Sequence, residues 1–398
     1  MYNQNIKSKP QGHSTPVQTI NQTNKSLLSY SFERSITMVK SRIVQTLLAK
    51  YHIKNYSFLP VVIAAMFFCS CQKEKLSNTA LNSTASSDAS FNAEALVRKH
   101  KSSILINYGA QITPPPDKNY VKFQLNVAGK LGISCLRVRA LVPCNSPNPL
   151  VDNRDNRYNI VLNFNRADFK GKQMPFATNL DQYKKDLLKT LSFYKKMPVV
   201  AVIENEESNR FYYSGTAQQY INQLNVAIGV MHNRGIKVAN GGITAQGLKY
   251  LVYQDFLNRG KKDSAEWFKQ IAEVTPNAPT TQDRGAFINT LLDAYTKMDL
   301  DYVNFHWKTT SPNTDALECV INYLQKRTRK PVISNELGQF DTDPNTLLSH
   351  IQLFTDKKCP FIIWFSPNQN SGLKETPLEY ANESLTPTGK AYQNYLAD

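Results

Sequence analysis

The sequence predicts one (β/α)₈ TIM barrel, a fold of the α/β class. Eight short runs rich in Val, Ile and Leu alternate with amphipathic segments over roughly 300 residues, a repeat typical of this fold. Most runs lack strict polar alternation, as expected of parallel strands that are covered on both faces. No Gly-rich phosphate loop follows any run, which disfavours the alternative of an open, doubly wound sheet.

Each strand and helix is predicted from its own pattern of apolar residues. The strands are predicted at Ser103–Gly109, Gly132–Val142, Asn159–Asn165, Pro198–Glu206, Ile236–Gly242, Asp301–Trp307, Pro331–Glu336 and Pro360–Ser366. The helices are predicted at Tyr120–Leu131, Leu180–Lys196, Ala217–Arg234, Gly285–Met298, Asp315–Arg329, Pro344–Asp356 and Thr388–Leu396. For the helix beginning at Ala217, Ser214 is a start signal and Gly235 a stop signal.

Two connections depart from a simple repeat. The segment between the second and third strands, "VPCNSPNPLVDNRDNRY", has no helical pattern, so an irregular connection is expected there. The fifth strand is followed by the long segment from Thr244 to Arg284, where we expect an insertion with one or two helices. A barrel tolerates both, because its loops vary more than its strands.

The N-terminal part does not have the pattern of a packed core. Residues 1–37 are rich in Asn, Gln, Ser and Thr without a period, which indicates disorder. An apolar run, Phe58–Phe68, then follows several basic residues and is too short to span a bilayer, which takes roughly 20 residues. A short uncleaved anchor or a buried apolar segment is the alternative to a secretory signal.

The end of this run resembles a bacterial lipoprotein signal, with Ser70 before Cys71 and a polar segment after it. The resemblance implies lipidation of Cys71, which would become the N-terminus of an exported lipoprotein at the outer membrane, on its periplasmic or cell-surface face. Met38 is a possible true start. We therefore expect a leader over 1–71, a flexible tether over 72–97 and the barrel over 98–398.

Charge and cysteine content exclude several classes of protein. The leader holds eight of the 47 Lys and Arg residues and one of the 31 Asp and Glu residues, so much of the formal charge of +16 leaves with it. The remaining basic residues are spread along helices, which argues against nucleic-acid binding. None of the later cysteines has zinc spacing, so no metal or cofactor is expected, although Cys135 and Cys144 could form a disulfide. A monomer is expected.

Two Asn-Glu pairs end predicted strands. Asn205-Glu206 closes the fourth strand and Asn335-Glu336 closes the seventh. The C-terminal ends of all strands surround one mouth of a barrel, so the two glutamates should face each other there. A pair of carboxylates about 5–5.5 Å apart suits glycosidic bond cleavage with retention of configuration. We assign no role to the neighbouring Glu204 and Glu207.

These motifs, "IENEES" and "ISNELG", resemble those of the clan of retaining glycoside hydrolases that includes cellulases, mannanases and β-galactosidases. The resemblance covers roughly residues 100–396, in strand order more than in identity. It implies that Glu206 is the acid/base, that Glu336 is the nucleophile, and that Asn205 binds the sugar hydroxyl next to the reacting carbon.

The same resemblance implies further site residues on other strands. An arginine beneath the nucleophile is matched by Arg137 or Arg139, and Arg139 is nearer the mouth. In "FHWK" on the sixth strand, His306 fits a contact to substrate or nucleophile, while Lys308 stands where clan members have a tyrosine.

Trp364 on the eighth strand matches the clan's sugar-stacking tryptophan, with a core aromatic as the alternative. Asn165, at the end of the third strand, is a candidate mouth residue. The sequence thus predicts a retaining β-glycoside hydrolase that acts on an oligo- or polysaccharide. A non-catalytic carbohydrate-binding lipoprotein on the same scaffold is the alternative.

Overall fold

The computed structural model describes residues 105–166, 173–369 and 371–398. The chain divides into two units, Met1–Ala89 and Ser90–Asp398, and every described residue belongs to the second. The predicted leader, the lipidation site Cys71 and the tether lie outside the described residues. Their assignments therefore stay predictions.

Eight parallel strands form a single sheet in the order β5-β4-β3-β2-β1-β8-β7-β6. Bridges between Ala239 and Tyr302 and between Ile243 and Phe305 connect the two end strands, so the sheet closes into a barrel. The predicted (β/α)₈ fold is confirmed. The strands are β1 (Asn107–Ile112), β2 (Cys135–Leu141), β3 (Asn159–Asn165), β4 (Val200–Ile203), β5 (Lys237–Asn240), β6 (Val303–Thr309), β7 (Val332–Gln339) and β8 (Phe361–Ser366).

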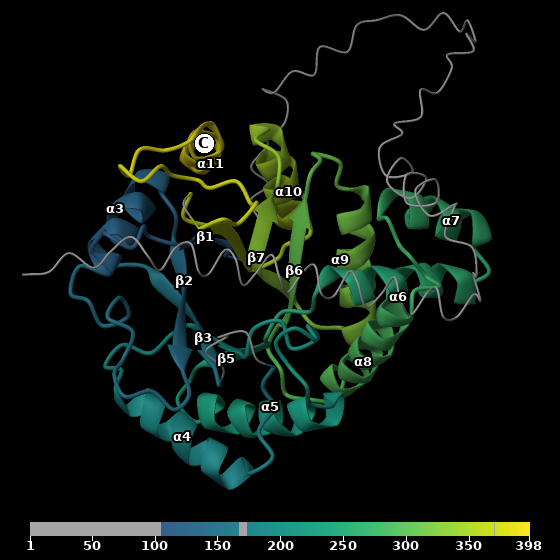
Figure 1. The fold of residues 1–398 in the computed structure, drawn as a ribbon, viewed down its shortest axis with the longest axis horizontal. Coiled ribbons are helices and arrows are strands. Elements are labelled where there is room, and N and C mark those ends of the chain that lie inside the picture. The colour runs from purple at the N-terminus through teal and green to yellow at the C-terminus, as the bar shows by residue number, and fades with distance from the viewer. Residues whose placement is uncertain (1–104, 167–172, 370) are drawn as a thin grey trace, which may run out of the picture. The chain divides into compact units, whose positions relative to one another are not determined.

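Helices surround the strands (Figure 1). Short polar side chains begin several of them: Asn119, for example, accepts a hydrogen bond from the backbone N–H of Lys122. The helices are α3 (Tyr120–Leu131), α4 (Leu180–Ser192), α5 (Ala217–His232), α6 (Ala245–Asn258), α7 (Lys262–Ile271), α8 (Pro279–Tyr295), α9 (Asp315–Thr328), α10 (Pro344–Asp356) and α11 (Pro387–Ala397).

The apolar core has two parts, because alternate strand residues face opposite sides of the barrel wall. The larger part packs the outer faces of the strands against the helices. The smaller part fills the barrel interior and includes Val161, Val202, Ile333 and Ile363. The interior side chains of the strands turn polar toward their C-terminal ends, where the candidate site lies.

Three details refine the predicted elements. β1 ends at Ile112 and not at Gly109, because residues 107–112 pair continuously with β8 despite the polar Gln111. The β2–β3 connection contains no helix, as predicted. The predicted insertion after β5 contains α6 and α7, and α8 begins at Pro279 instead of Gly285, with proline in the first turn.

The described residues contain no helix that combines the length and the apolar character needed to cross a membrane. The four described cysteines are free, so the disulfide considered between Cys135 and Cys144 does not form. Cys135 instead lies in the interior apolar cluster of the barrel.

Candidate active site

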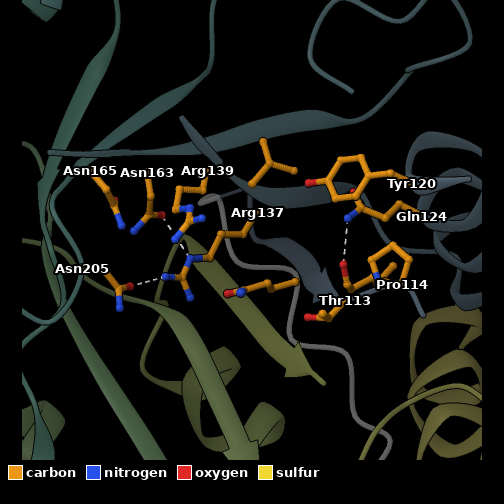
Figure 2. A pocket seen from close by; sticks show the side chains of 12 residues that line it. Thr113, Pro114, Tyr120, Gln124, Arg137, Arg139, Asn163, Asn165 and Asn205 are labelled. Atoms are coloured by element: carbon orange, nitrogen blue, oxygen red, sulfur yellow. Dashed lines mark hydrogen bonds between the residues drawn. The ribbon is translucent and has the colours of Figure 1, made fainter. Parts of the chain in front are cut away.

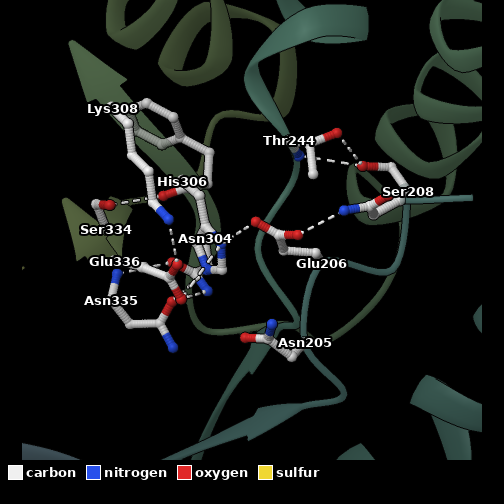
Figure 3. A network of polar contacts seen from close by, with 12 residues as sticks. Asn205, Glu206, Ser208, Thr244, Asn304, His306, Lys308, Ser334, Asn335 and Glu336 are labelled. Carbon is white, nitrogen blue, oxygen red and sulfur yellow. Dashed lines mark hydrogen bonds and ion pairs between the residues drawn. The ribbon is translucent and has the colours of Figure 1, made fainter. Parts of the chain in front are cut away.

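Glu206 and Glu336 meet at the C-terminal mouth of the barrel (Figure 3). One oxygen of each carboxylate and a ring nitrogen of His306 all lie within 4.8 Å of one another. His306 Nδ1 is 3.1 Å from Glu206 Oε1 and 3.8 Å from Glu336 Oε2. The carboxylates are thus too close for the roughly 6.5–9.5 Å spacing of inverting glycosidases.

A bulge in β7 directs two consecutive side chains toward the site. On both sides of β7 the pairing register slips, between Asn304 and His306 of β6 and between Ser334 and Leu337 of β7 itself. Without the slip, strand alternation would place Asn335 and Glu336 on opposite faces. With it, the side chain of Asn335 reaches His306 and Asn163 while the carboxylate of Glu336 reaches Arg137, and His306 is paired with Glu336 in the register.

The chain turns sharply at the end of β4, and this turn gives the three glutamates that follow the strand different surroundings. Glu204 and Glu206 have positive φ angles of 66° and 55°, which are uncommon for residues other than glycine. The turn leaves Glu206 partly accessible, with its side chain 15% exposed, while Glu204 and Glu207 are buried. Asn209 Nδ2 donates to Glu206 Oε2 over 2.7 Å.

The two buried carboxyl groups anchor this turn. Glu204 accepts hydrogen bonds from Tyr213 and Gln223, and Glu207 accepts them from Asn240 and Tyr295. Burial raises the pKa of Glu204, and it raises the pKa of Glu207 to about 7 despite these hydrogen bonds. Their contacts are with the scaffold, so they support the loop that carries Glu206.

Arg137 holds Glu336 from below. Its Nη1 donates to Glu336 Oε2 over 2.5 Å and to the backbone oxygen of Asn335 over 3.1 Å. Its Nε donates to Asn163 Oδ1 over 3.0 Å, and its Nη2 donates to Asn205 Oδ1. One guanidinium thereby fixes parts of β3, β7 and the residues after β4.

Of the two arginines that the sequence left open, Arg137 is the one beneath the candidate nucleophile. Arg137 and Arg139 lie on the same face of β2. Arg137 comes two residues earlier in the strand, so it lies deeper in the barrel and reaches Glu336 from inside. Arg139 is exposed and lines a cavity beside the glutamates, so it stays a candidate substrate contact. Strand alternation left both arginines possible, because it does not reveal how deep each one lies in the barrel.

The surroundings keep Glu336 ionised. Burial alone would raise its pKa, but the charges of His306, Arg137 and Lys308 outweigh burial and hold the pKa of Glu336 well below its usual range. Glu206 forms no ion pair with a lysine or arginine among the described residues. The two carboxylates therefore have different electrostatic surroundings.

Lys308 occupies the position where the clan has a tyrosine, and it contacts the candidate nucleophile directly. Its Nζ is 3.1 Å from Glu336 Oε1 and 2.6 Å from Glu375 Oε1. Burial alone would lower the pKa of Lys308, but Glu336 and Glu375 raise it above the usual value. Lys308 is therefore charged and shared between two carboxylates.

Replacing Lys308 by methionine should move the acid limb of the kcat/KM profile to higher pH. The substitution removes a positive charge from Glu336, whose pKa then rises toward the ordinary carboxyl range, so Glu336 takes up a proton sooner as pH falls. A pH–rate profile measures this. Glu375→Gln is the matched control, because it leaves the ammonium on Glu336. An acid limb that stays in place in Lys308→Met would contradict the contact.

Buried amide groups position His306, which is only 3% exposed. Its Nε2 is 2.9 Å from Asn335 Oδ1, and Asn335 is in turn held by Asn163 and Asn304. A Cβ on Gly242 would lie 2.2 Å from this ring nitrogen, and the φ of Gly242 is +111°. Both the lack of space and the backbone conformation therefore require glycine at this position. His306 therefore orients the glutamates. Of the predicted contact with substrate or nucleophile, the structure has the one to Glu336, and a contact with substrate stays a prediction.

The predicted sugar-stacking role of Trp364 is wrong. Trp364 is 1% exposed and belongs to the outer apolar core, because β8 turns it toward the helices. Phe361 and Ile363 face the interior, so alternation also turns Phe365 inward. Lys308 Nζ lies 4.9 Å from the centre of the Phe365 ring, beside the site.

Asn205, Arg139 and Asn165 are brought together, as lining residues of one cavity next to the glutamates. Sequence reasoning missed Phe365, Glu375 and Tyr212. Burial raises the pKa of Tyr212, as do the negative charges of Glu206 and Glu336. Tyr212 lies in the connection between β4 and α5 and Glu375 in the one between β8 and α11, and no apolar pattern placed either near the site.

Glu206, His306 and Glu336 have the donor atoms and spacing that a metal ion could use. Their surroundings fit a cation poorly, because Arg137 and Lys308 already place two positive charges on Glu336. The arrangement fits acid/base and nucleophilic chemistry by two carboxylates better than it fits metal binding.

No known family and no curated protein matches the sequence. Similar solved structures include a GH128 (subgroup II) endo-β-1,3-glucanase from Sorangium cellulosum, with 13% identity over 73% of this chain and 98% of that one, at a TM-score of 0.48. A hyperthermophilic β-glucosidase mutant has 12% identity over 73% and 99%, also at 0.48. A GH128 (subgroup VII) oligosaccharide-binding protein from Trichoderma gamsii has 12% identity over 73% and 94%, at 0.45. Likeness this low carries no argument about activity.

Proposed function

We propose that this protein is a retaining β-glycoside hydrolase in which Glu336 is the nucleophile and Glu206 the acid/base. The observation that carries the proposal is the unequal electrostatics of the close carboxylate pair. Glu336 contacts Arg137 and Lys308, which keep it anionic and unable to donate a proton. Glu206 contacts a histidine and an amide and is the more exposed of the two, so it is left to exchange protons.

The reaction then has two steps. In the first, Glu336 attacks the anomeric carbon while protonated Glu206 transfers its proton to the departing glycosidic oxygen. In the second, Glu206 takes a proton from water, and the resulting hydroxide displaces Glu336 from the glycosyl-enzyme. Two inversions at one carbon leave the β configuration unchanged, and Glu206 ends protonated again.

Binding without cleavage is the second candidate function. Its one supporting observation is that Lys308 engages Glu336 through its carboxylate oxygen Oε1, an oxygen that an attacking nucleophile would need free. Hydrolysis of a panel of aryl β-glycosides and β-linked polysaccharides separates the two. Turnover that disappears in Glu336→Gln supports the enzyme, while glycan binding without turnover in the unsubstituted protein supports the binding function.

We also propose export as a lipoprotein, from the leader pattern alone. Cys71→Ala should yield a protein that no longer partitions into detergent, because the apolar run Phe58–Phe68 is too short to anchor it. Detergent phase separation of membrane fractions measures this. An intact peptide spanning Phe68 to Cys71 in the membrane-bound native protein, found by mass spectrometry, would contradict cleavage before Cys71.

A further inference from the structure

Cations hold both oxygens of the candidate nucleophile. Glu336 Oε2 accepts from Arg137, and Glu336 Oε1 lies 3.1 Å from Lys308 Nζ (Figure 3). A bond from Glu336 to the sugar removes the negative charge of the carboxylate, so both ion pairs weaken as that bond forms. The oxygen that attacks must also be released by its cation, because the sugar takes that place.

Arg137 has little freedom to move away from its oxygen. Its side chain is only 6% exposed, and it also donates to the side chains of Asn163 and Asn205, as Figure 2 shows. These bonds hold the guanidinium in place whether or not Glu336 is charged. Oε2 therefore keeps its partner, and Oε1 is the oxygen that can be released.

Lys308 can move away, because a second carboxylate lies beside it. Its Nζ is 2.6 Å from Glu375 Oε1, closer than to Glu336, and the side chain of Glu375 is only 9% exposed. A lysine ammonium sits on a flexible stem, so it can turn from one acceptor to the other with little movement. The Phe365 ring, whose centre is 4.9 Å from Nζ, lies beside the ammonium.

The loop that carries Glu375 is attached to β7 and to the turn that follows it. The backbone N–H of Thr376 donates to the backbone oxygen of Gln339 over 2.8 Å, and its hydroxyl donates to the backbone oxygen of Asp341 over 2.5 Å. Glu336 belongs to β7 as well. The two carboxylates that share Lys308 are therefore held in place by the same strand.

We propose that Glu375 is a positioning residue for the nucleophile, which takes over the ammonium of Lys308 when Glu336 Oε1 attacks the sugar. In that step the bond from Oε1 to the anomeric carbon forms, the bond to the departing oxygen breaks, and Glu206 gives its proton to that oxygen. Glu336 loses its charge, whereas Lys308 keeps its own. Glu375 then pairs with the ammonium until the second step returns the charge to Glu336. This role rests on the proposed function, because it concerns the attacking oxygen.

The two steps should respond differently to the loss of Glu375. Without it, the ammonium stays on Glu336 before the attack and has no carboxylate partner in the glycosyl-enzyme, so the first step becomes harder for two reasons. The second step restores the ion pair between Lys308 and Glu336, so it should not slow. A residue that only supported the loop would affect both steps.

The test measures the two steps separately in the full chain. Release of the aryl group in a single turnover of an activated aryl β-glycoside gives the rate of the first step, and mass spectrometry of the decaying glycosyl-enzyme gives that of the second. Glu375→Gln should slow the first step about ten- to a hundredfold, the worth of one hydrogen bond to a charged group. The second step should be no slower.

Glu383→Gln is the matched control. It makes the same chemical change in the same connection between β8 and α11, where Glu383 accepts a hydrogen bond from Asn126 of α3. Neither step should change in this variant.

Adding Lys308→Met distinguishes a positioning role from support of the fold. In the Lys308→Met background no ammonium has to be moved, so Glu375→Gln should cause no further loss in the first step. Should Glu375→Gln fail to fold, Glu375→Asp retains the charge at a shorter reach. It should slow the first step to a smaller degree, again only where Lys308 is present.

The positioning role is contradicted if Glu375→Gln leaves the first step unchanged, if the loss is as large in the Lys308→Met background, or if both steps slow equally. An equal loss in Glu383→Gln would also contradict it. Each of these outcomes leaves the proposed function intact. Absence of turnover in the unsubstituted protein would instead overturn the proposed function, and the role of Glu375 with it.

Discussion

Replacing Glu336 by alanine should abolish turnover even of activated aryl β-glycosides, because no other group can form the glycosyl-enzyme. Replacing Glu206 by alanine should slow the hydrolysis of natural glycans by about 10²–10⁴-fold, the usual contribution of a general acid–base catalyst. An activated leaving group departs without a proton, so the first step on such a substrate should survive in part. Initial rates on paired substrates measure both effects.

Added azide separates the two roles. In Glu206→Ala, azide can attack the glycosyl-enzyme without a general base, so the product should be the β-glycosyl azide. In Glu336→Ala, azide can enter only from the face that the nucleophile left open, which gives the α-glycosyl azide. Proton NMR distinguishes these products. If Glu206→Ala gave the α-glycosyl azide and Glu336→Ala the β-glycosyl azide, the two roles would be reversed. Full activity in both variants would show that other residues catalyse the reaction.

Arg137→Met should lower the free energy of unfolding by about 3–5 kcal/mol, the cost of removing one partner of a buried ion pair. The side chains of Arg137 and Glu336 are only 6% and 10% exposed, so water cannot replace the lost guanidinium, although Lys308 remains beside Glu336. The variant also loses the bonds to Asn163, to Asn205 and to the backbone of Asn335. Urea denaturation measures the change.

Arg139→Met is the matched control, since it lies two residues further along the same strand and is exposed. Its free energy of unfolding should change by no more than about 0.5 kcal/mol, as for most surface substitutions. Should Arg137→Met fail to fold, Arg137→Lys retains the charge but not the four-way geometry, and it should still be clearly destabilised. Equal stability losses at the two arginines would contradict the central role of Arg137.

The sign of the pH effect follows from the lowered pKa of Glu336. A carboxyl group with a lowered pKa in the fold stabilises it at pH values above the unfolded pKa, and this contribution is lost as pH falls through the folded value. The stability difference between the wild type and Arg137→Met should therefore be greatest near neutral pH and shrink in acid. A difference that grows in acid would contradict the ion pair as its source.

The barrel itself was predictable from the sequence alone. Parallel strands buried on both faces must be continuous apolar runs, and helices that cover them must be amphipathic, so the alternation of the two patterns determines the fold. Counting the predicted strands along the chain also places Glu206 at the end of the fourth strand and Glu336 at the end of the seventh. Because every strand of such a barrel ends at one mouth, their meeting there was predictable before any contact was known.

What the tertiary structure alone decided is which neighbours those glutamates have. Strand alternation does not reveal depth, so it could not choose Arg137 over Arg139 beneath Glu336. A bulge changes alternation locally, and the bulge in β7 turns Asn335 and Glu336 toward the same interior. The inward residue of β8 is Phe365 and not Trp364, because facing depends on register with both neighbouring strands and not on residue type.

The ion pair between Lys308 and Glu375 could also be recognised only in the structure. The two residues are 67 positions apart in the chain, and Glu375 lies in a loop without a periodic pattern, so only folding brings Glu375 to the lysine that contacts Glu336. Local sequence can specify which residues are buried and on which strand they end, since those depend on short-range apolar patterning. The ionisation of the site depends on distances between charges from separate loops, and these distances exist only in the folded chain.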